Sequence, residues 1–156
     1  MNNIQGKFPS TRLRRNRMKD FSRRLVAENT LSVNDLILPL FVCEGNKVDD
    51  PINSMPGVSR YSIDKLLNEV EKAVKFNIPA IAIFPQIESG LKNSEGSLAV
   101  DENNLVCRSI KSIKKDFPNI GIICDVALDP FTDHGHDGLV INDKIDNDKT
   151  LEVLEQ

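Results

Sequence analysis

Residues 120–138 read IGIICDVALDPFTDHGHDG, and the fold assignment starts from this stretch. Residues 120–123 are apolar apart from one glycine, which is typical of a buried strand. Four aspartates follow the run, at positions 125, 129, 133 and 137. In barrel and doubly wound α/β folds, functional sites lie where strands end. Carboxylates at this point are therefore well placed to hold a cation or a polar substrate.

The rest of the chain alternates between predicted strands and helices. Apolar runs at residues 36–42 and 80–84 predict strands, and the third strand is expected over residues 120–128. Apolar residues at helical spacing predict helices near residues 62–77 and 101–117, with Ser62 and Asp101 as the candidate caps. Asp148 is the candidate cap of a short last helix. This order indicates a parallel sheet with crossover helices, although Pro39 argues against a central position for the first strand.

The aspartate-rich stretch resembles the metal-site loop of the porphobilinogen synthase (5-aminolevulinate dehydratase) family. Three positions that are cysteines in the zinc-dependent members hold Ala127, Asp129 and Asp137 here, so the chain resembles the zinc-independent branch. Other segments resemble the family in the same order along the chain, namely residues 12–15, 24–26, 35–42, 54–60, 83–85 and 104–110. The resemblance runs from about residue 8 to about residue 155.

The resemblance implies an α/β fold, a TIM (β/α)8 barrel preceded by an extended N-terminal arm. A closed barrel of this type takes about 250 residues, and this chain has 156. We therefore expect the N-terminal half of such a barrel, with three parallel strands and their intervening helices. Residues 1–34 are assigned to the arm, which has a short helix near residues 18–27, and residues 35–156 to a truncated barrel domain.

The family is a lyase (a hydro-lyase) that condenses two 5-aminolevulinate molecules to porphobilinogen, with loss of two waters, in tetrapyrrole and heme biosynthesis. The resemblance implies catalytic roles for Asp125, Asp129 and Asp137, with Asp129 and Asp137 as metal ligands. Carboxylates are hard oxygen ligands, so the expected cofactor is Mg²⁺, with a monovalent cation as the alternative; zinc is not expected.

The family also uses two lysines that form Schiff bases with the substrate ketones. In the family these lysines lie on strands of the second half of the barrel. No lysine of this chain lies in an apolar strand-end context that would depress its pKa. The chain alone is therefore expected to be inactive.

Plainer interpretations of the same aspartates remain open. Asp125 would cap a nearby backbone N–H, and Asp129 and Asp137 would be solvated turn residues. Asp133 matches no ligand position of the family and is assigned to the surface.

The residues around the aspartates also have two readings. His134 and His136 have the His-x-His spacing of some zinc sites, but no thiolate or third histidine completes such a site, so we expect a hydrogen-bonding role. Gly135 and Gly138 are expected in tight turns. Lys92, in the loop after the second strand, either covers the site or is simply solvated.

Charge is distributed unevenly along the chain. Residues 1–27 carry eight basic residues and one acid, whereas the remainder carries twelve basic residues and twenty-two acids. A basic arm on an acidic body predicts docking on an acidic neighbour. In the family the arm wraps around an adjacent subunit of a homo-octamer, which implies an oligomer interface at Arg12, Arg14 and Arg15. A solvated tail is the alternative; the arm lacks interleaved aromatic residues, so no nucleic-acid partner is expected.

Cysteine usage and hydropathy indicate the compartment. The three cysteines are scattered and form no Cys-x-x-Cys pair, which is typical of reduced thiols in the cytoplasm. No signal peptide and no apolar stretch of membrane-spanning length is present. We expect a cytoplasmic protein without a membrane partner.

Two functions other than that of a porphobilinogen synthase half remain open. The chain is alternatively a non-catalytic half-barrel module that docks on a full-length subunit or a complementary chain. A different barrel enzyme, such as a metal-dependent aldolase, is the third reading, and the ordered arm and loop matches argue against it.

Overall fold

The structure is a computed structural model that describes residues 6–7, 9–11 and 14–156. The chain divides into two compact units, Met1–Ser32 and Val33–Gln156, and each is described by itself. Within the described residues, no helix has both the length and the apolar character needed to cross a membrane.

The first unit contains two short helices with no buried residue, α1 (Arg15–Met18) and α2 (Asp20–Leu25). The short helix expected near residues 18–27 is α2, which is shorter than expected; α1 was not expected, and the extended backbone of Lys19 separates the two. Asp20 pairs with Arg24 at 3.0 Å in the first turn of α2, where a carboxylate also favours the helix dipole. The hydrogen bonds and ion pairs of α1 and α2 in the described residues thus join positions at most six apart.

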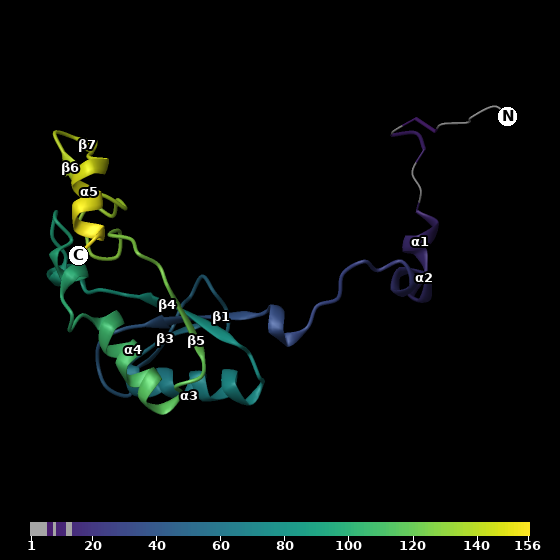
Figure 1. Ribbon diagram of the computed structural model, residues 1–156, viewed down its shortest axis with the longest axis horizontal. Coiled ribbons are helices and arrows are strands. Elements are labelled where there is room, and N and C mark those ends of the chain that lie inside the picture. The colour runs from purple at the N-terminus through teal and green to yellow at the C-terminus, as the bar shows by residue number, and fades with distance from the viewer. Residues whose placement is uncertain (1–5, 8, 12–13) are drawn as a thin grey trace. The chain divides into compact units, whose positions relative to one another are not determined.

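The second unit is built on a five-stranded sheet (Figure 1). The three longest strands, which are parallel, lie side by side as β1, β4 and β5, and the short β3 and β2 continue the sheet beyond β1. Their bounds are β1 Ile37–Val42, β2 Asp49–Pro51, β3 Ser59–Tyr61, β4 Ala80–Pro85 and β5 Gly121–Cys124. The predicted parallel sheet with crossover helices is confirmed.

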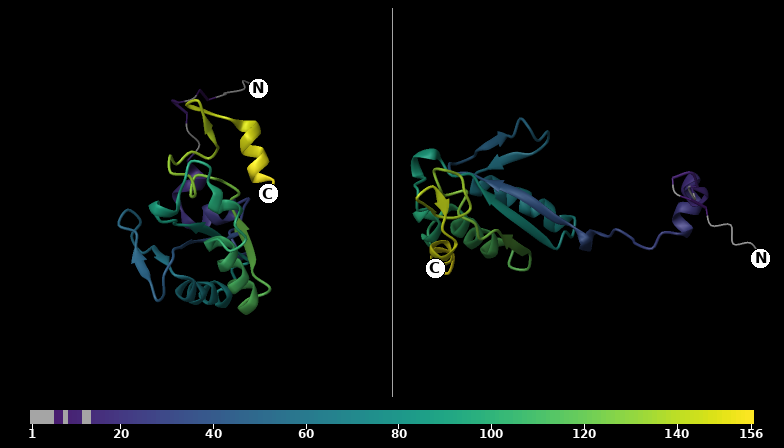
Figure 2. Two further views of the ribbon diagram at one scale, coloured as in Figure 1. Left: turned by 90° about the vertical axis from the view of Figure 1, so that its left-hand side faces the viewer. Right: turned by 90° about the horizontal axis from the view of Figure 1, so that it is seen from above.

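Helices α3 (Ile63–Lys75) and α4 (Leu105–Asp116) pack against one face of this sheet (Figures 1 and 2). Each helix buries residues about four apart on one face, as an amphipathic helix on a sheet must. The buried positions are Leu66, Val70 and Ala73 on α3, and Leu105, Ser109 and Ile113 on α4. Together with Ile81 and Ile83 of β4, which are at most 1% exposed, they form the centre of the core.

Two strand predictions need correction or explanation. β5 ends at Cys124 and not at residue 128, because the chain leaves the sheet to bury Leu128, whose carbonyl accepts the N–H groups of Phe131 and Thr132 at 2.9 Å. Pro39 does lie in β1, but β3 pairs only with residues 41–42 of that strand. Pro39 therefore has a neighbouring strand on one side only within the described sheet, where a missing N–H is tolerated.

Helix α3 begins at the predicted place without the predicted cap. Ser62 occupies the N-cap position, but its hydroxyl does not accept a helix N–H. The Ser62 Oγ instead donates to the carboxylate of Asp64 at 2.6 Å and accepts the Val48 N–H at 2.9 Å. The Asp64 carboxylate also accepts the Lys47 N–H. Together the bonds of Ser62 and Asp64 connect the β1–β2 turn to the helix. The hydrogen bonds from Ser62 and Lys47 hold the pKa of Asp64 below its ordinary value.

Asn104, and not Asp101, caps helix α4. The buried Asn104 amide accepts the Cys107 N–H at 2.9 Å and donates to the Ala99 carbonyl at 3.0 Å. Asp101 instead accepts the Asn103 N–H at 2.8 Å and forms the turn that precedes the helix. The cap position lies three residues later than predicted because that turn comes first.

Replacing Asn104 by Ala should therefore lower the free energy of unfolding by about 1–3 kcal/mol, since it removes the cap and leaves a carbonyl unpaired. Asn103→Ala is the matched control, because the Asn103 side chain is exposed. Urea denaturation followed by circular dichroism would compare the two variants with the wild type, and equal midpoints for all three would contradict the prediction.

The last part of the chain is a hairpin followed by a helix. Strands β6 (Val140–Ile141) and β7 (Lys144–Ile145) are joined by Asn142 and Asp143, which both have positive φ, as a two-residue hairpin turn of the I′ type requires. Helix α5 (Asn147–Leu154) is capped by the Asp146 side chain, so the prediction of Asp148 as its cap is wrong.

Gly138 lies in a bend of the chain and is also required for close packing. It is buried, and a Cβ at this position would lie 2.7 Å from the Thr150 hydroxyl. That hydroxyl accepts the Leu139 N–H at 2.9 Å and donates to the Asp146 carbonyl at 2.6 Å. Gly135, by contrast, has a φ of +70°, as a turn glycine does.

Candidate functional site

The candidate site is formed by two loops that follow neighbouring parallel strands. We call residues 86–96, after β4, the β4 loop, and residues 125–138, after β5, the aspartate loop. β4 and β5 pair in parallel from Ala80↔Gly121 to Ile83↔Cys124, so both loops leave from the carboxyl ends of the strands. Those strand ends are where α/β folds place ligands.

Asn93 fastens the β4 loop to the aspartate loop. Its backbone N–H donates to the Phe131 carbonyl at 3.3 Å, and its carbonyl accepts the Asp133 N–H at 3.2 Å, which makes a parallel bridge between Asn93 and Thr132. The Asn93 side chain in turn donates to the Ser97 hydroxyl at 2.6 Å and accepts the Ser97 N–H at 3.1 Å. Two backbone hydrogen bonds therefore join the two loops.

His134 adds a further link between the loops. Its Nδ1 accepts the His136 N–H at 3.1 Å, and its Nε2 lies 3.3 Å from the Ser94 carbonyl. A neutral imidazole with its proton on Nε2 satisfies both contacts. Both ring nitrogens of His134 are thus engaged within the protein, which is the hydrogen-bonding role expected for this residue.

Thr132 holds the turn between the two histidines. It is 1% exposed, and its hydroxyl donates to the His136 carbonyl at 3.0 Å. Since the neighbouring Phe131 is also buried, the centre of the aspartate loop is anchored in the core while its aspartates remain at the surface.

The three predicted aspartates lie on this loop with exposed side chains. Asp125 directly follows the last residue of β5. The pKa of Asp129 is raised, mainly because the carboxyl is partly withdrawn from water. The charges of Asp137 and Asp125 raise this pKa further, whereas the charge of Lys92 in the β4 loop lowers it. Asp129 remains exposed, so its desolvation is incomplete. The charges of Asp125 and Asp137 thus both act on Asp129, and Asp133 lies exposed at the surface.

The raised pKa of Asp129 predicts a pH dependence of stability. A group whose pKa is higher in the folded state stabilises the fold fully below its unfolded-state pKa, about 3.9 for aspartate, and this contribution is lost as the pH rises through the folded-state value. Asp129→Asn cannot ionise, so we expect the variant to gain stability relative to the wild type as the pH rises above about 4.

Urea titrations at several pH values would measure this difference. Asp133→Asn is the control, because Asp133 is not among the charges that shift Asp129. A difference between Asp129→Asn and the wild type that does not change with pH would contradict the prediction.

The aspartate loop offers few metal ligands. Among the described residues, no group of three or more histidine, cysteine, aspartate or glutamate side chains is arranged to hold a metal. Mg²⁺ keeps several waters and takes one or two carboxylates from the protein, which suits the exposed Asp129 and Asp137. A closed zinc site takes four ligands, and Ala127 has none to offer.

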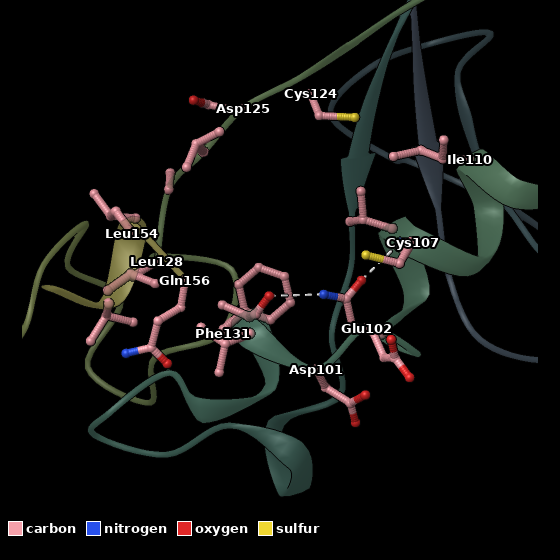
Figure 3. Close-up of a pocket in the computed structure, with 17 residues that line it drawn as sticks. Asp101, Glu102, Cys107, Ile110, Cys124, Asp125, Leu128, Phe131, Leu154 and Gln156 are labelled. Carbon is pink, nitrogen blue, oxygen red and sulfur yellow. Dashed lines mark hydrogen bonds between the residues drawn. The ribbon is translucent and has the colours of Figure 1, made fainter. Parts of the chain in front are cut away.

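A pocket of about 440 Å³ lies beside the candidate site (Figure 3). It is lined by α4, by the segment that follows β5 and by the end of α5, with Cys107, Cys124 and Phe131 among its walls. Asp125 lines it, but Asp129 and Asp137 do not. β5 is the last strand of the sheet, so the pocket lies at an edge without a neighbouring strand in the described residues. We therefore do not assign the site to this pocket.

Sequence reasoning missed the link through Asn93 and Ser94. A usable signal was present, because a polar loop after one parallel strand is expected to meet the loop after the next. It also missed the ion pair between Glu44, which follows β1, and Arg108 on α4. Because these two residues are 64 positions apart, no local pattern could have identified that pair.

Comparison with known proteins gives the relatives of this chain. The family model described as delta-aminolevulinic acid dehydratase matches residues 10–156. The delta-aminolevulinic acid dehydratase of Bradyrhizobium diazoefficiens is 53% identical over 143 residues, which are 92% of this chain and 40% of the relative. That of Chlamydia pneumoniae is 44% identical, over 93% of this chain and 44% of the relative.

The structure also matches a solved one. The crystal structure of delta-aminolevulinic acid dehydratase (porphobilinogen synthase) from Toxoplasma gondii ME49, in complex with the reaction product porphobilinogen, has a TM-score of 0.83 at 39% identity. The match covers 97% of this chain and 42% of that one. The chain thus spans about two-fifths of the length of these relatives, and its α/β sheet corresponds to the N-terminal half of their TIM barrel. The chain belongs to the delta-aminolevulinic acid dehydratase family.

Proposed function

We propose that this chain supplies the N-terminal half of a porphobilinogen synthase subunit. The complete subunit would act as a hydro-lyase and condense two 5-aminolevulinate molecules to porphobilinogen in heme and tetrapyrrole biosynthesis. The aspartate loop at the carboxyl end of β5, in a chain of this family, is the observation that carries the proposal. The product-bound Toxoplasma gondii relative supports it.

In this proposal the three carboxylates position one substrate. The charge of Asp137 acts on Asp129, and together the two carboxylates would attract the cationic or polarised part of the substrate. Asp125 is the carboxylate nearest to the sheet and assists in positioning or in proton transfer. The links through Asn93 and His134 keep the loop in one arrangement, which matters because misplacement of a reacting group by about 1 Å reduces rates about 10²-fold.

The proposed cofactor is Mg²⁺, with a monovalent cation as the alternative. Asp129 and Asp137 would hold it, together with water molecules. When bound, a cation of this kind neutralises carboxylate repulsion and polarises an oxygen of the substrate. The donor chemistry of the two aspartates supports this part of the proposal, as does the charge of Asp137, which adds to desolvation in raising the pKa of Asp129.

The experiment that tests the function is an assay of the full-length subunit that contains this chain. Purified subunit incubated with 5-aminolevulinate should form porphobilinogen, with a rate that depends on Mg²⁺ or on a monovalent cation. Absence of product over a range of pH and of added cations would refute the proposed activity.

We further propose that the protein forms homo-oligomers through its N-terminal arm and resides in the cytoplasm. Arg14 and Arg15 are exposed in the first unit, as are Met18, Phe21 and Leu25, which are 60–80% exposed. Basic and apolar side chains of this kind are typical of a segment that docks on an acidic surface with an apolar centre. Arg12, the third predicted interface residue, lies outside the described residues. The cysteines, all of them free, accord with a reducing compartment.

A non-catalytic assembly module is the second candidate function. The observation that favours it is the absence of any lysine from β1, β4 and β5. Co-purification of the 156-residue chain with a tagged full-length subunit would support this function. Recovery of the tagged subunit without the 156-residue chain would argue against it.

A further inference from the structure

We propose that Arg108 is a positioning residue of the candidate site, which joins the loop after β1 to the turn through which the chain passes from the β4 loop into α4. The catalytic consequence of this role rests on the proposed function. The structural link, by contrast, is a property of the 156-residue chain by itself and can be measured there.

The Arg108 side chain holds two separate segments at once. Its guanidinium pairs with the carboxylate of Glu44, which lies just beyond the end of β1. Its Nε donates to the Asn103 carbonyl at 2.9 Å, in the turn before α4. The two paired side chains are 41% and 36% exposed, so water screens the ion pair only in part. The fixed fork of a guanidinium can serve two such acceptors together, which a single ammonium cannot match.

The turn before α4 is bonded in its turn to the β4 loop. Asn104 donates through its side chain to the Ala99 carbonyl at 3.0 Å. The Ala99 N–H donates to the Gly96 carbonyl at 2.8 Å, and the Gly96 N–H donates to the Asn93 carbonyl at 3.2 Å. Asn93 is the residue whose backbone bridges to the aspartate loop. A series of hydrogen bonds therefore leads from Arg108 to the aspartate loop.

The first turns of α4 also lie close to the aspartate loop in space. Asp101, Asn104 and Cys107 line the same pocket as Asp125 (Figure 3). Arg108 directly follows Cys107 along the helix. Movement of this part of α4 would therefore change the surroundings of Asp125.

Loss of the Arg108 links should loosen these loops and leave the core intact. The centre of the core is formed by apolar residues of β4, α3 and α4, and Arg108 is not among its buried positions. Local opening takes less free energy than global unfolding, and it differs from one region to another. The amides that join the two loops should therefore exchange faster with solvent, whereas those of β4 should keep their protection.

The first measurement is amide hydrogen exchange, followed by NMR in the 156-residue chain. In Arg108→Ala, the Asn93 and Asp133 amides, which form the bridge between the loops, should exchange about three- to tenfold faster, since an ion pair and a hydrogen bond are both lost. In Glu44→Ala, which loses only the ion pair, the increase should be about two- to fivefold. The amide of Ile81, at the buried centre of β4, should be unaffected.

Two further variants separate the geometry of the side chain from its charge. Arg108→Lys keeps the positive charge but not the fork, so its loop amides should exchange nearly as fast as those of Arg108→Ala. Lys75→Ala breaks an exposed ion pair with Glu71 within α3 and should match the wild type.

The second measurement is the steady-state kinetics of the full-length subunit with 5-aminolevulinate. Arg108→Ala should lower kcat about tenfold, because the carboxylates of the loop are held less firmly, and should change KM by less than about twofold. The double variant Glu44→Ala/Arg108→Ala should lose no more activity than Arg108→Ala, since the two side chains act as a pair. Lys75→Ala should again match the wild type.

The possible failures are distinguishable. Unchanged exchange at Asn93 and Asp133 in Arg108→Ala would overturn the link, as would an equal acceleration at Ile81, which indicates a general loss of stability. Faster exchange of the loop amides with an unchanged kcat would overturn the positioning role. A wild-type full-length subunit that forms no porphobilinogen would refute the proposed function and with it the catalytic role of Arg108, and the exchange data would decide the structural link by themselves.

Discussion

The 156-residue chain by itself is expected to form no detectable porphobilinogen from 5-aminolevulinate. Formation of a Schiff base requires an unprotonated amine, which a lysine provides when burial depresses its pKa. All twelve lysines of the chain lie in described residues, and only Lys65 and Lys92 are even half-buried. Carboxylates of Glu69 and Glu152 hold the pKa values of Lys72 and Lys149 above the ordinary value.

The measurement is a direct comparison of the 156-residue chain with the full-length subunit at equal concentration. Borohydride reduction in the presence of 5-aminolevulinate provides a second readout, because it would trap a Schiff base as a stable mass increase. Product formation, or a trapped adduct on any lysine of the short chain, would disprove the prediction.

Loss of the carboxylates at positions 129 and 137 should produce the second large effect. In the full-length subunit, Asp129→Ala and Asp137→Ala should each lower kcat/KM about 10²-fold, since each removes a group that positions the substrate. The two effects should be less than additive, because the carboxylates act on one another and would hold the same cation or substrate group.

Asp133→Ala is the matched control, since Asp133 is an exposed aspartate of the same loop. It should retain activity within about threefold of the wild type, as surface substitutions change stability by only ~0.5 kcal/mol. Circular dichroism would show whether all the variants fold. A similar loss in Asp133→Ala, or full activity in Asp129→Ala, would rule out the proposed roles.

The local patterns of the chain predict the elements well where burial and periodicity agree. The apolar run at residues 80–84 is β4, and the apolar residues at helical spacing after Ser62 are in α3. In an alternating α/β fold, strands are covered on both faces and read as apolar runs, whereas helices bury one face and show helical spacing. Boundaries were less predictable. The caps at Asn104 and Asp146, and the early end of β5, depend on hydrogen bonds that compete with the obvious local candidates.

Some residues of the candidate site are identifiable from the sequence, and others are not. The sequence alone identifies Asp125, Asp129 and Asp137, because carboxylates after a buried strand and a family resemblance point to the same loop. Only the tertiary structure brings Lys92 and Asn93 to that loop, about forty residues away along the chain. The order of the chain determines which residues follow a strand. The pairing of β4 with β5 determines which loops become neighbours. Contacts between distant segments of this kind leave no local pattern in the sequence.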